Sequence, residues 1–245
     1  MNIIKVVIPV AGFDARFIPI IKALPKGIIP VLDKPSIQYV VEEAVAAGII
    51  NILLITGRRK QAIERHFDKS QELEKEPKRS GKGDRLERVR EITDLADIHY
   101  VSQRERTGLD NAVTHARNHV GAQPFALLLG DTIVNNEVPC TSMLIEYAEE
   151  HDRSVLSLER VSWEEVFSYG VGDVDETEPD QERILVSDFV EKPSRDEAPS
   201  NLVITGRYVL TPYMFDELAA TTPGVGGELQ LTDAIRELVR EWADG

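Results

Sequence analysis

The stretch Ile3-Ile4-Lys5-Val6-Val7-Ile8-Pro9-Val10, which runs into Ala11-Gly12, decides the fold. A short run rich in isoleucine and valine, with almost no polar position, is typical of a strand buried on both faces of a parallel sheet. The glycine after it allows the backbone to approach a ligand closely. Parallel sheets bind ligands beyond the carboxyl ends of their strands, so the sequence predicts a site beyond Val10.

Short apolar runs alternate with helical patterns through the first half of the chain. Further strands are expected at Asn51–Thr56, Ile98–Ser102 and Phe125–Leu129, and helices at Ser36–Gly48 and Leu109–Asn118. Ser36 is expected to cap the start of its helix and Gly48 to end it. This alternation predicts βα units and an α/β fold with a largely parallel sheet.

After Glu150 the strand-like runs follow one another closely, which predicts an antiparallel or mixed extension of the sheet. These runs are Ser154–Glu159, Tyr169–Val174, Ile184–Glu191 and Asn201–Leu210, and helices at Pro212–Ala220 and Gln230–Trp242 follow them. The charged segment 69–90 contains one proline and two glycines, so we expect an exposed insertion with a mobile centre. Without a repeat or a clear linker, residues 1–245 are expected to form a single domain.

The composition narrows the classes of function. A net charge of −14 argues against non-specific binding to nucleic acid, which needs a basic surface. The acidity indicates either a protein adapted to high salt or an ordinary acidic protein. Apolar runs are too short to span a membrane, and Ile3–Val10 lacks the basic leader of a signal peptide. The single cysteine, Cys140, suits a reducing cytoplasm. The composition does not determine the oligomeric state, so a homo-oligomer is one of the possibilities.

Two cations near the first loop are candidate phosphate ligands. Gly12 lets the backbone approach a base or a phosphate, and Arg16 is placed to hold phosphate oxygens. Lys26 adds a second cation to the same loop region. The alternative is a strand-to-loop turn with a surface arginine, together with an ordinary solvated lysine.

Two further strands are followed by charged residues. Asp131 follows the run Phe125–Leu129, where a carboxylate is well placed to hold Mg²⁺. Its alternative role is to cap a turn. Glu191 and Lys192 end another apolar run, because Pro193 stops the strand and leaves both side chains at its mouth. Their alternative role is an exposed ion pair of little energetic value.

Short motifs occur along the whole chain in one order. They are Pro9-Val10-Ala11-Gly12, Arg16, Pro25-Lys26, Asp33-Lys34-Pro35-Ser36-Ile37-Gln38-Tyr39-Val40, Gln103, Gly108-Leu109, Gly130-Asp131, Tyr169-Gly170-Val171, Glu191-Lys192-Pro193, Pro199-Ser200-Asn201-Leu202, Gly206-Arg207-Tyr208 and Gly227-Glu228-Leu229-Gln230-Leu231-Thr232-Asp233-Ala234-Ile235. In this order they resemble the bacterial-type UTP–glucose-1-phosphate uridylyltransferases, which are sugar-1-phosphate nucleotidyltransferases. The resemblance implies a three-layer, Rossmann-like α/β fold with a mixed, mostly parallel sheet between helices.

The resemblance also implies an activity and a role for each matching residue. The family forms UDP-glucose and pyrophosphate from UTP and glucose 1-phosphate, in the presence of Mg²⁺. By resemblance, Ala11, Gly12, Gln103 and Gly108 contact uracil and ribose, Arg16 and Lys26 hold the triphosphate, Asp131 binds Mg²⁺, Gly170 and Glu191 contact the hexose, and Lys192 neutralises the sugar phosphate. We expect Gly12, Gln103, Asp131, Glu191 and Lys192 to converge on one cleft.

Three features depart from the family pattern. Asp14 replaces the second glycine of the first loop, and Asp110 replaces a glycine beside the base. Each adds negative charge near a polyanionic nucleotide. The family's second metal aspartate belongs to a segment that has no equivalent before Gly245. These departures predict weak or absent synthesis with retained binding, so the alternative function is a degenerate paralogue that binds nucleotide or sugar nucleotide. A ligand-free scaffold is a third reading, which the retained charged residues argue against.

Overall fold

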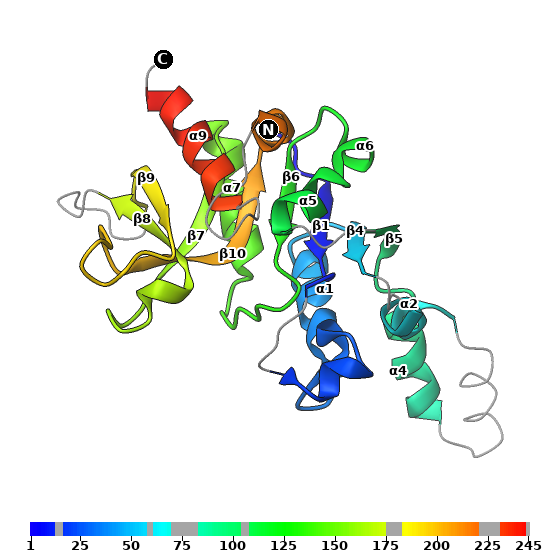
Figure 1. The fold of residues 1–245 in the computed structure, drawn as a ribbon. Helices are drawn as coiled ribbons and strands as arrows, with labels where there is room; N and C mark the ends of the chain where they lie inside the picture. Colours follow the sequence, from blue (N-terminus) through cyan, green and yellow to red (C-terminus); the bar gives the residue numbers. More distant parts are fainter. Residues whose placement is uncertain are drawn as a thin grey trace.

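One eight-stranded sheet lies between helices in a three-layer architecture (Figure 1). The computed structural model describes residues 1–12, 17–57, 61–69, 83–103, 108–174, 183–220 and 231–243, and only the backbone of 83–86, 110 and 240–243. The sheet contains β1 (Lys5–Pro9), β4 (Asn51–Thr56), β5 (Asp97–Ser102), β6 (Phe125–Leu128), β7 (Val155–Arg160), β8 (Gly170–Val174), β9 (Val186–Glu191) and β10 (Leu202–Leu210). The strand order is β5-β4-β1-β6-β10-β8-β9, and β7 pairs with β10.

Strands β5, β4, β1 and β6 form the parallel part of the sheet. Their side chains alternate between two buried cores, as expected for strands covered on both faces. In β1, Val7 points into one core, whereas Val6 and Ile8 point into the other. All three are fully buried, which explains why this strand reads as a continuous apolar run.

The helices divide between the two faces according to the core they complete. Helices α1 (Ser36–Ala46), α2 (Gln61–Phe67) and α7 (Cys140–His151) pack on the core of Val6 and Ile8. Helices α5 (Leu109–Thr114), α6 (Arg117–Val120), α8 (Met214–Ala220) and α9 (Leu231–Ala243) pack on the opposite core. The remaining elements are α4 (Gly83–Thr93), the short helices η2 (Ile20–Lys22), η3 (Lys26–Ile28) and η4 (Val166–Ser168), and the hairpin of β2 (Pro30–Val31) and β3 (Lys34–Pro35).

Strands β7 to β10 form the antiparallel part of the sheet. Strand β10 is longer than β6: Arg207 lies opposite Leu128, the last residue of β6, and Leu202–Ile204 run past that end. There Val203 of β10 pairs with Val171 of β8. Strand β8 thus lies on the same edge of β10 as β6, which pairs with the later residues of β10, whereas β7 lies on the other edge. The β8–β9 hairpin therefore lies just beyond the carboxyl end of β6, and Figure 1 shows it across β10 from β1, β4 and β5.

The expected mixed sheet and its antiparallel extension are confirmed, whereas some local predictions are wrong. Pro35 takes the N-cap position of α1, and the hydroxyl of Ser36 instead donates to the carbonyl of Gly27 at 3.2 Å. The helix expected over Leu109–Asn118 is two short helices, α5 and α6. Gly48 does end its helix, with a φ of 86°.

Other expectations concern organisation. Helix α7 has no counterpart among the elements predicted from sequence. Residues 70–82 of the charged segment lie outside the described residues, and the single-domain prediction stays a prediction. Among the helices that the structure describes, none is long and apolar enough to cross a membrane.

Candidate active site

The residues predicted to contact the base lie beyond the ends of β1 and β5, next to the end of β4. Ala11 and Gly12 follow β1, and the amide of Val10 still donates to Ile55 at 2.8 Å. The amide of Gln103 donates to the carbonyl of Thr56 at 2.9 Å, which continues the pairing of β4 and β5. Backbone pairing between adjacent strands thus fixes where both loops begin.

Gln103 links its loop to the start of α5. Its side chain is buried and donates to the carbonyl of Gly108 at 3.2 Å and to Asn111 Oδ1 at 3.1 Å. The structure therefore brings together two residues that were predicted to contact the nucleotide. Gly108 is the N-cap of α5, with a φ of 111° that favours glycine.

Lys26 and Asp131, predicted to hold the triphosphate and the metal ion, form an ion pair with each other. Lys26 Nζ lies 2.9 Å from Asp131 Oδ2, and their side chains are 18% and 45% exposed. Lys26 is therefore not an ordinary solvated lysine. The amide of Gly130 donates to the carbonyl of Pro9 at 3.3 Å, so Asp131 is held next to the loop that begins at Ala11.

The residues predicted to bind the sugar lie on the β8–β9 hairpin, next to α9. Gly170 lies opposite Glu191, whose carboxylate pairs through Oε1 with Lys192 Nζ at 3.1 Å. The Thr232 hydroxyl, from α9, donates to the other oxygen, Oε2, at 2.6 Å. A Cβ atom at Gly170 would lie 2.8 Å from Thr232 Oγ1, so glycine there leaves room for this contact. Both oxygens of Glu191 are thus oriented.

Helix α9 holds β9 at a second point one turn further on. Arg236 donates to both oxygens of Asp188, at 2.7 and 3.0 Å, and this bond raises the pKa of the arginine. Burial, and then the nearby charge of Glu191, raise the pKa of Asp233. Thr232 and Arg236 were not predicted from the sequence as partners of β9, although their spacing of four residues places them on one helical face.

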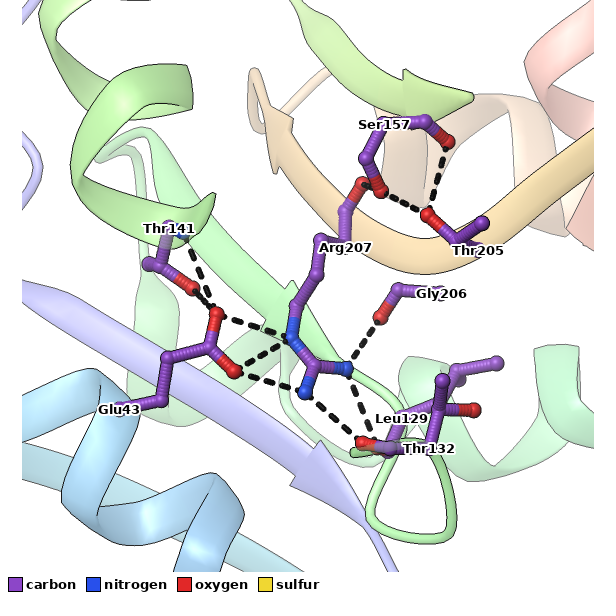
Figure 2. A network of polar contacts seen from close by, with 8 residues as sticks. All are labelled: Glu43, Leu129, Thr132, Thr141, Ser157, Thr205, Gly206 and Arg207. Atoms are coloured by element: carbon purple, nitrogen blue, oxygen red, sulfur yellow. Dashed lines mark hydrogen bonds and ion pairs between the residues drawn. The ribbon is translucent and has the colours of Figure 1, made fainter. Parts of the chain in front are cut away.

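Arg207 and Glu43 form a buried ion pair that was not predicted from the sequence. Arg207 is fully buried, and its guanidinium lies 2.8 Å from the Glu43 carboxylate (Figure 2). The signal was present in the sequence, because an arginine inside the apolar run Asn201–Leu210 needs a buried partner. The partner lies 164 residues away in the chain, so local patterns do not identify it.

For three residues discussed from the sequence, the structure does not describe the position of the side chain. Arg16 and Asp14 lie outside the described residues, and so does the side chain of Asp110. Convergence of all five expected residues on one cleft stays a prediction, although Gln103 contacts Gly108 and Lys26 contacts Asp131. Within the described side chains there is no cluster of three or more metal-binding residues, so Asp131 stands as a single carboxylate candidate.

Comparison with known proteins identifies the family. The nucleotidyl transferase family model matches residues 5–243. The chain belongs to the nucleotidyl transferase family. Within this family it is 49% identical over 236 residues to UTP–glucose-1-phosphate uridylyltransferase 2 of Staphylococcus saprophyticus, covering 96% of this chain and 81% of that protein. It is 48% identical to the UTP–glucose-1-phosphate uridylyltransferase of Bacillus subtilis, covering 96% and 80%.

Solved structures of nucleotidyl transferases agree with the sequence match. A UDP-glucose pyrophosphorylase complexed with UDP-glucose is 36% identical and superposes with a TM-score of 0.88, covering 98% of this chain and 88% of that one. A UTP-bound enzyme of the same kind from Acinetobacter baumannii is 38% identical, with a TM-score of 0.88 and coverage of 97% and 82%. The resemblance to the uridylyltransferases seen in the sequence is thereby confirmed.

Proposed function

We propose that this chain transfers the uridylyl group of UTP to glucose 1-phosphate, forming UDP-glucose and pyrophosphate. One observation carries the proposal: the chain is about half identical to named uridylyltransferases. It also has charged residues at the positions to which the family resemblance assigns the triphosphate, the metal ion and the sugar phosphate. Of these, Asp131 follows β6 and pairs with Lys26, which begins η3, whereas Glu191 and Lys192 lie at the end of β9.

The reaction is a direct displacement at phosphorus. An oxygen of the sugar phosphate attacks the α-phosphorus of UTP, and the bond to the bridging oxygen of the β-phosphate breaks. Pyrophosphate leaves with that electron pair. Catalysis of this kind depends on positioning and on stabilising the charge of the phosphate oxygens.

In this proposal the parallel part of the sheet binds the nucleotide. Ala11, Gly12, Gln103 and Gly108 contact uracil and ribose, and Arg16 and Lys26 hold the triphosphate. Asp131 binds Mg²⁺, which suits a single exposed carboxylate because Mg²⁺ keeps several waters and takes one or two protein carboxylates. Bound Mg²⁺ would offset the negative charge of the triphosphate.

The antiparallel part binds the sugar phosphate. Glu191 accepts hydrogen bonds from sugar hydroxyls, and Gly170 offers its backbone to the hexose. The side chain of Lys192 is half exposed, which leaves its ammonium group able to turn toward the sugar phosphate. An ammonium group there neutralises negative charge on the attacking sugar phosphate. The sugar phosphate can then approach the triphosphate of UTP, which is also an anion. The protein is expected to work in the cytoplasm, where its single cysteine suits a reducing environment.

The alternative is a degenerate paralogue that binds UTP or UDP-glucose without efficient catalysis. It is motivated by Asp14 and Asp110, and the similar proteins give it no support. A pyrophosphate-release assay with UTP or dTTP and with glucose 1-phosphate or galactose 1-phosphate tests both functions and the specificity. We expect turnover of about 1 to 10³ s⁻¹ with UTP and glucose 1-phosphate, the usual enzyme range. Tight UDP-glucose binding without turnover would favour the alternative.

A further inference from the structure

Arg207 uses every donor of its guanidinium at the junction of β10 and β6. An arginine side chain carries five N–H donors. Nε donates to both oxygens of Glu43, at 3.1 and 3.0 Å, and Nη2 donates to Glu43 Oε2 at 2.8 Å. The other donors reach backbone carbonyls: Nη2 that of Thr132 at 2.8 Å, and Nη1 those of Leu129 at 3.4 Å and Gly206 at 3.1 Å. Figure 2 shows these contacts together.

Two of these carbonyls flank Asp131. Leu129 and Thr132 are the first and last residues of the turn 129–132, in which the amide of Thr132 donates to the carbonyl of Leu129 at 3.3 Å. The guanidinium therefore holds both ends of the turn that carries the candidate metal ligand. A charged donor at these carbonyls forms stronger bonds than a neutral one.

Glu43 fixes the arginine and connects it to α7. The Glu43 carboxylate accepts from the Thr141 hydroxyl at 2.6 Å and from the Thr141 amide at 3.2 Å, near the start of α7. Its side chain is only 9% exposed. The contacts from Thr141 fix the position of the carboxylate against which the guanidinium of Arg207 is oriented.

An irregularity in β10 brings the arginine into place. The pairing of β10 with β7 shifts register between Ile204 and Tyr208, and Gly206 has a φ of 77°. A Cβ atom at Gly206 would lie 2.9 Å from the side chain of Leu129, whose amide donates to the Gly206 carbonyl at 2.9 Å. The irregularity thus joins β10 to the same turn that Arg207 holds.

We propose that Arg207, oriented by Glu43, is a positioning residue for Asp131, because it fixes the two carbonyl groups that flank that aspartate. The inference rests on the proposed metal-binding role of Asp131. A merely structural ion pair would be replaceable by apolar residues of similar volume at little cost. A positioning pair would not be replaceable in this way, because apolar side chains leave the turn without its donors.

The test uses paired replacements. The double variant Glu43→Leu with Arg207→Met removes both charges and avoids leaving one buried charge unpaired. Arg207→Lys is the second variant, since a lysine keeps the charge but lacks the planar set of five donors. The matched control is Asp188→Leu with Arg236→Met, which removes the bidentate pair between β9 and α9 and does not touch the turn 129–132.

Two readouts are measured on full-length protein. The first is amide hydrogen exchange of Gly130 and Thr132 in the absence of metal and nucleotide. The second is the affinity for Mn²⁺, a spectroscopic substitute for Mg²⁺, in the presence of UTP. We expect the double variant to exchange these two amides at least about tenfold faster and to bind Mn²⁺ roughly tenfold more weakly, the usual loss when a support of a metal ligand is removed. The control should match the wild type in both.

The outcomes separate the possibilities. A double variant that folds and matches the wild type in either readout overturns the inference. If it does not fold, Arg207→Lys decides: faster exchange confined to the turn supports the inference, and equal acceleration throughout β1 and β6 overturns it. Asp131→Asn tests the underlying proposal, because unchanged Mn²⁺ affinity in this variant removes the metal role of Asp131 itself. Weakened affinity there, with unchanged affinity in the double variant, overturns only the positioning role.

Discussion

The parallel and antiparallel parts of the sheet hold their functional residues in different ways. In the parallel part, backbone hydrogen bonds at the strand ends place the loops, as with Gln103 on Thr56 and Gly130 on Pro9. In the antiparallel part, side chains of α9 hold β9, through Thr232 on Glu191 and Arg236 on Asp188. The loops predicted to bind the nucleotide thus begin at paired strand ends, with the Arg207 side chain as a further support of the turn 129–132. The residues predicted to bind the sugar depend more directly on side chains of α9.

This difference predicts that the two substrates respond separately to mutation. Changes at the β9–α9 contact should alter the handling of glucose 1-phosphate and leave UTP binding intact. Changes near the loops of the parallel part should do the reverse. Only residues that contact the reacting phosphate groups should reduce turnover strongly.

The largest effect is expected for Lys192→Met. Loss of a charge that stabilises the reacting phosphate should lower kcat by about 10² to 10³-fold, as for other donors of this kind. UTP affinity, measured by calorimetry, should change less than about threefold, below 1 kcal/mol. Arg153→Met is the control, because Arg153 is an exposed cation next to β7. A fall in UTP affinity as large as the fall in kcat would place Lys192 on the nucleotide side.

A smaller and more selective effect is expected for Thr232→Val. The variant keeps the shape of threonine and removes one hydrogen bond to Glu191, so KM for glucose 1-phosphate should rise roughly threefold to tenfold. KM for UTP should stay unchanged, and Thr232→Ser should restore the wild-type value. Steady-state kinetics with each substrate varied in turn measures both. Equal increases in the two KM values would show that α9 does not serve the sugar side alone.

Asp14 and Asp110 stand where the family pattern has glycine, and restoring glycine is expected to have an effect similar to or smaller than that of Thr232→Val. If Asp14 and Asp110 face the triphosphate, Asp14→Gly and Asp110→Gly should each strengthen UTP binding several-fold at low salt, because like charges about 4 Å apart repel by up to roughly 4 kcal/mol before screening. Calorimetry with Mg²⁺ and with chelator measures this. If the glycine variants bind UTP more weakly only when Mg²⁺ is present, the aspartates are metal ligands instead.

The smallest effect is expected for His66 in α2, through the pH dependence of the free energy of unfolding. Burial lowers the pKa of His66, whose Nε2 lies 3.0 Å from Gln38 Oε1 on α1. The unfolded chain therefore binds a proton more readily, and the free energy of unfolding should fall as the pH drops from 7 through the ordinary histidine pKa of about 6.5. His66→Gln should flatten this part of the profile in urea denaturation at pH 7, 6 and 5. An unchanged slope would exclude His66 as the cause.

Sequence patterns predicted the parts of the molecule that depend on local order. The apolar runs located the strands, and as expected Asp131 comes soon after β6 and Glu191 is the last residue of β9. Contacts between distant segments were not predictable in this way. Arg207 meets Glu43 across 164 residues, and Thr232 meets Glu191 across 41, so their partners depend on the tertiary arrangement. The prediction that Ser36 caps α1 was wrong because the preceding residue, Pro35, already occupies the N-cap position.

The most direct test of the central claim is the formation of UDP-glucose by the wild type and by Asp131→Asn, measured side by side with UTP, glucose 1-phosphate and Mg²⁺. Uridylyl transfer supported by a metal ion at Asp131 predicts steady turnover for the wild type and a loss of about 10²-fold or more in the variant. Wild-type protein that binds UTP and UDP-glucose but forms no product, or a variant as active as the wild type, would contradict the account.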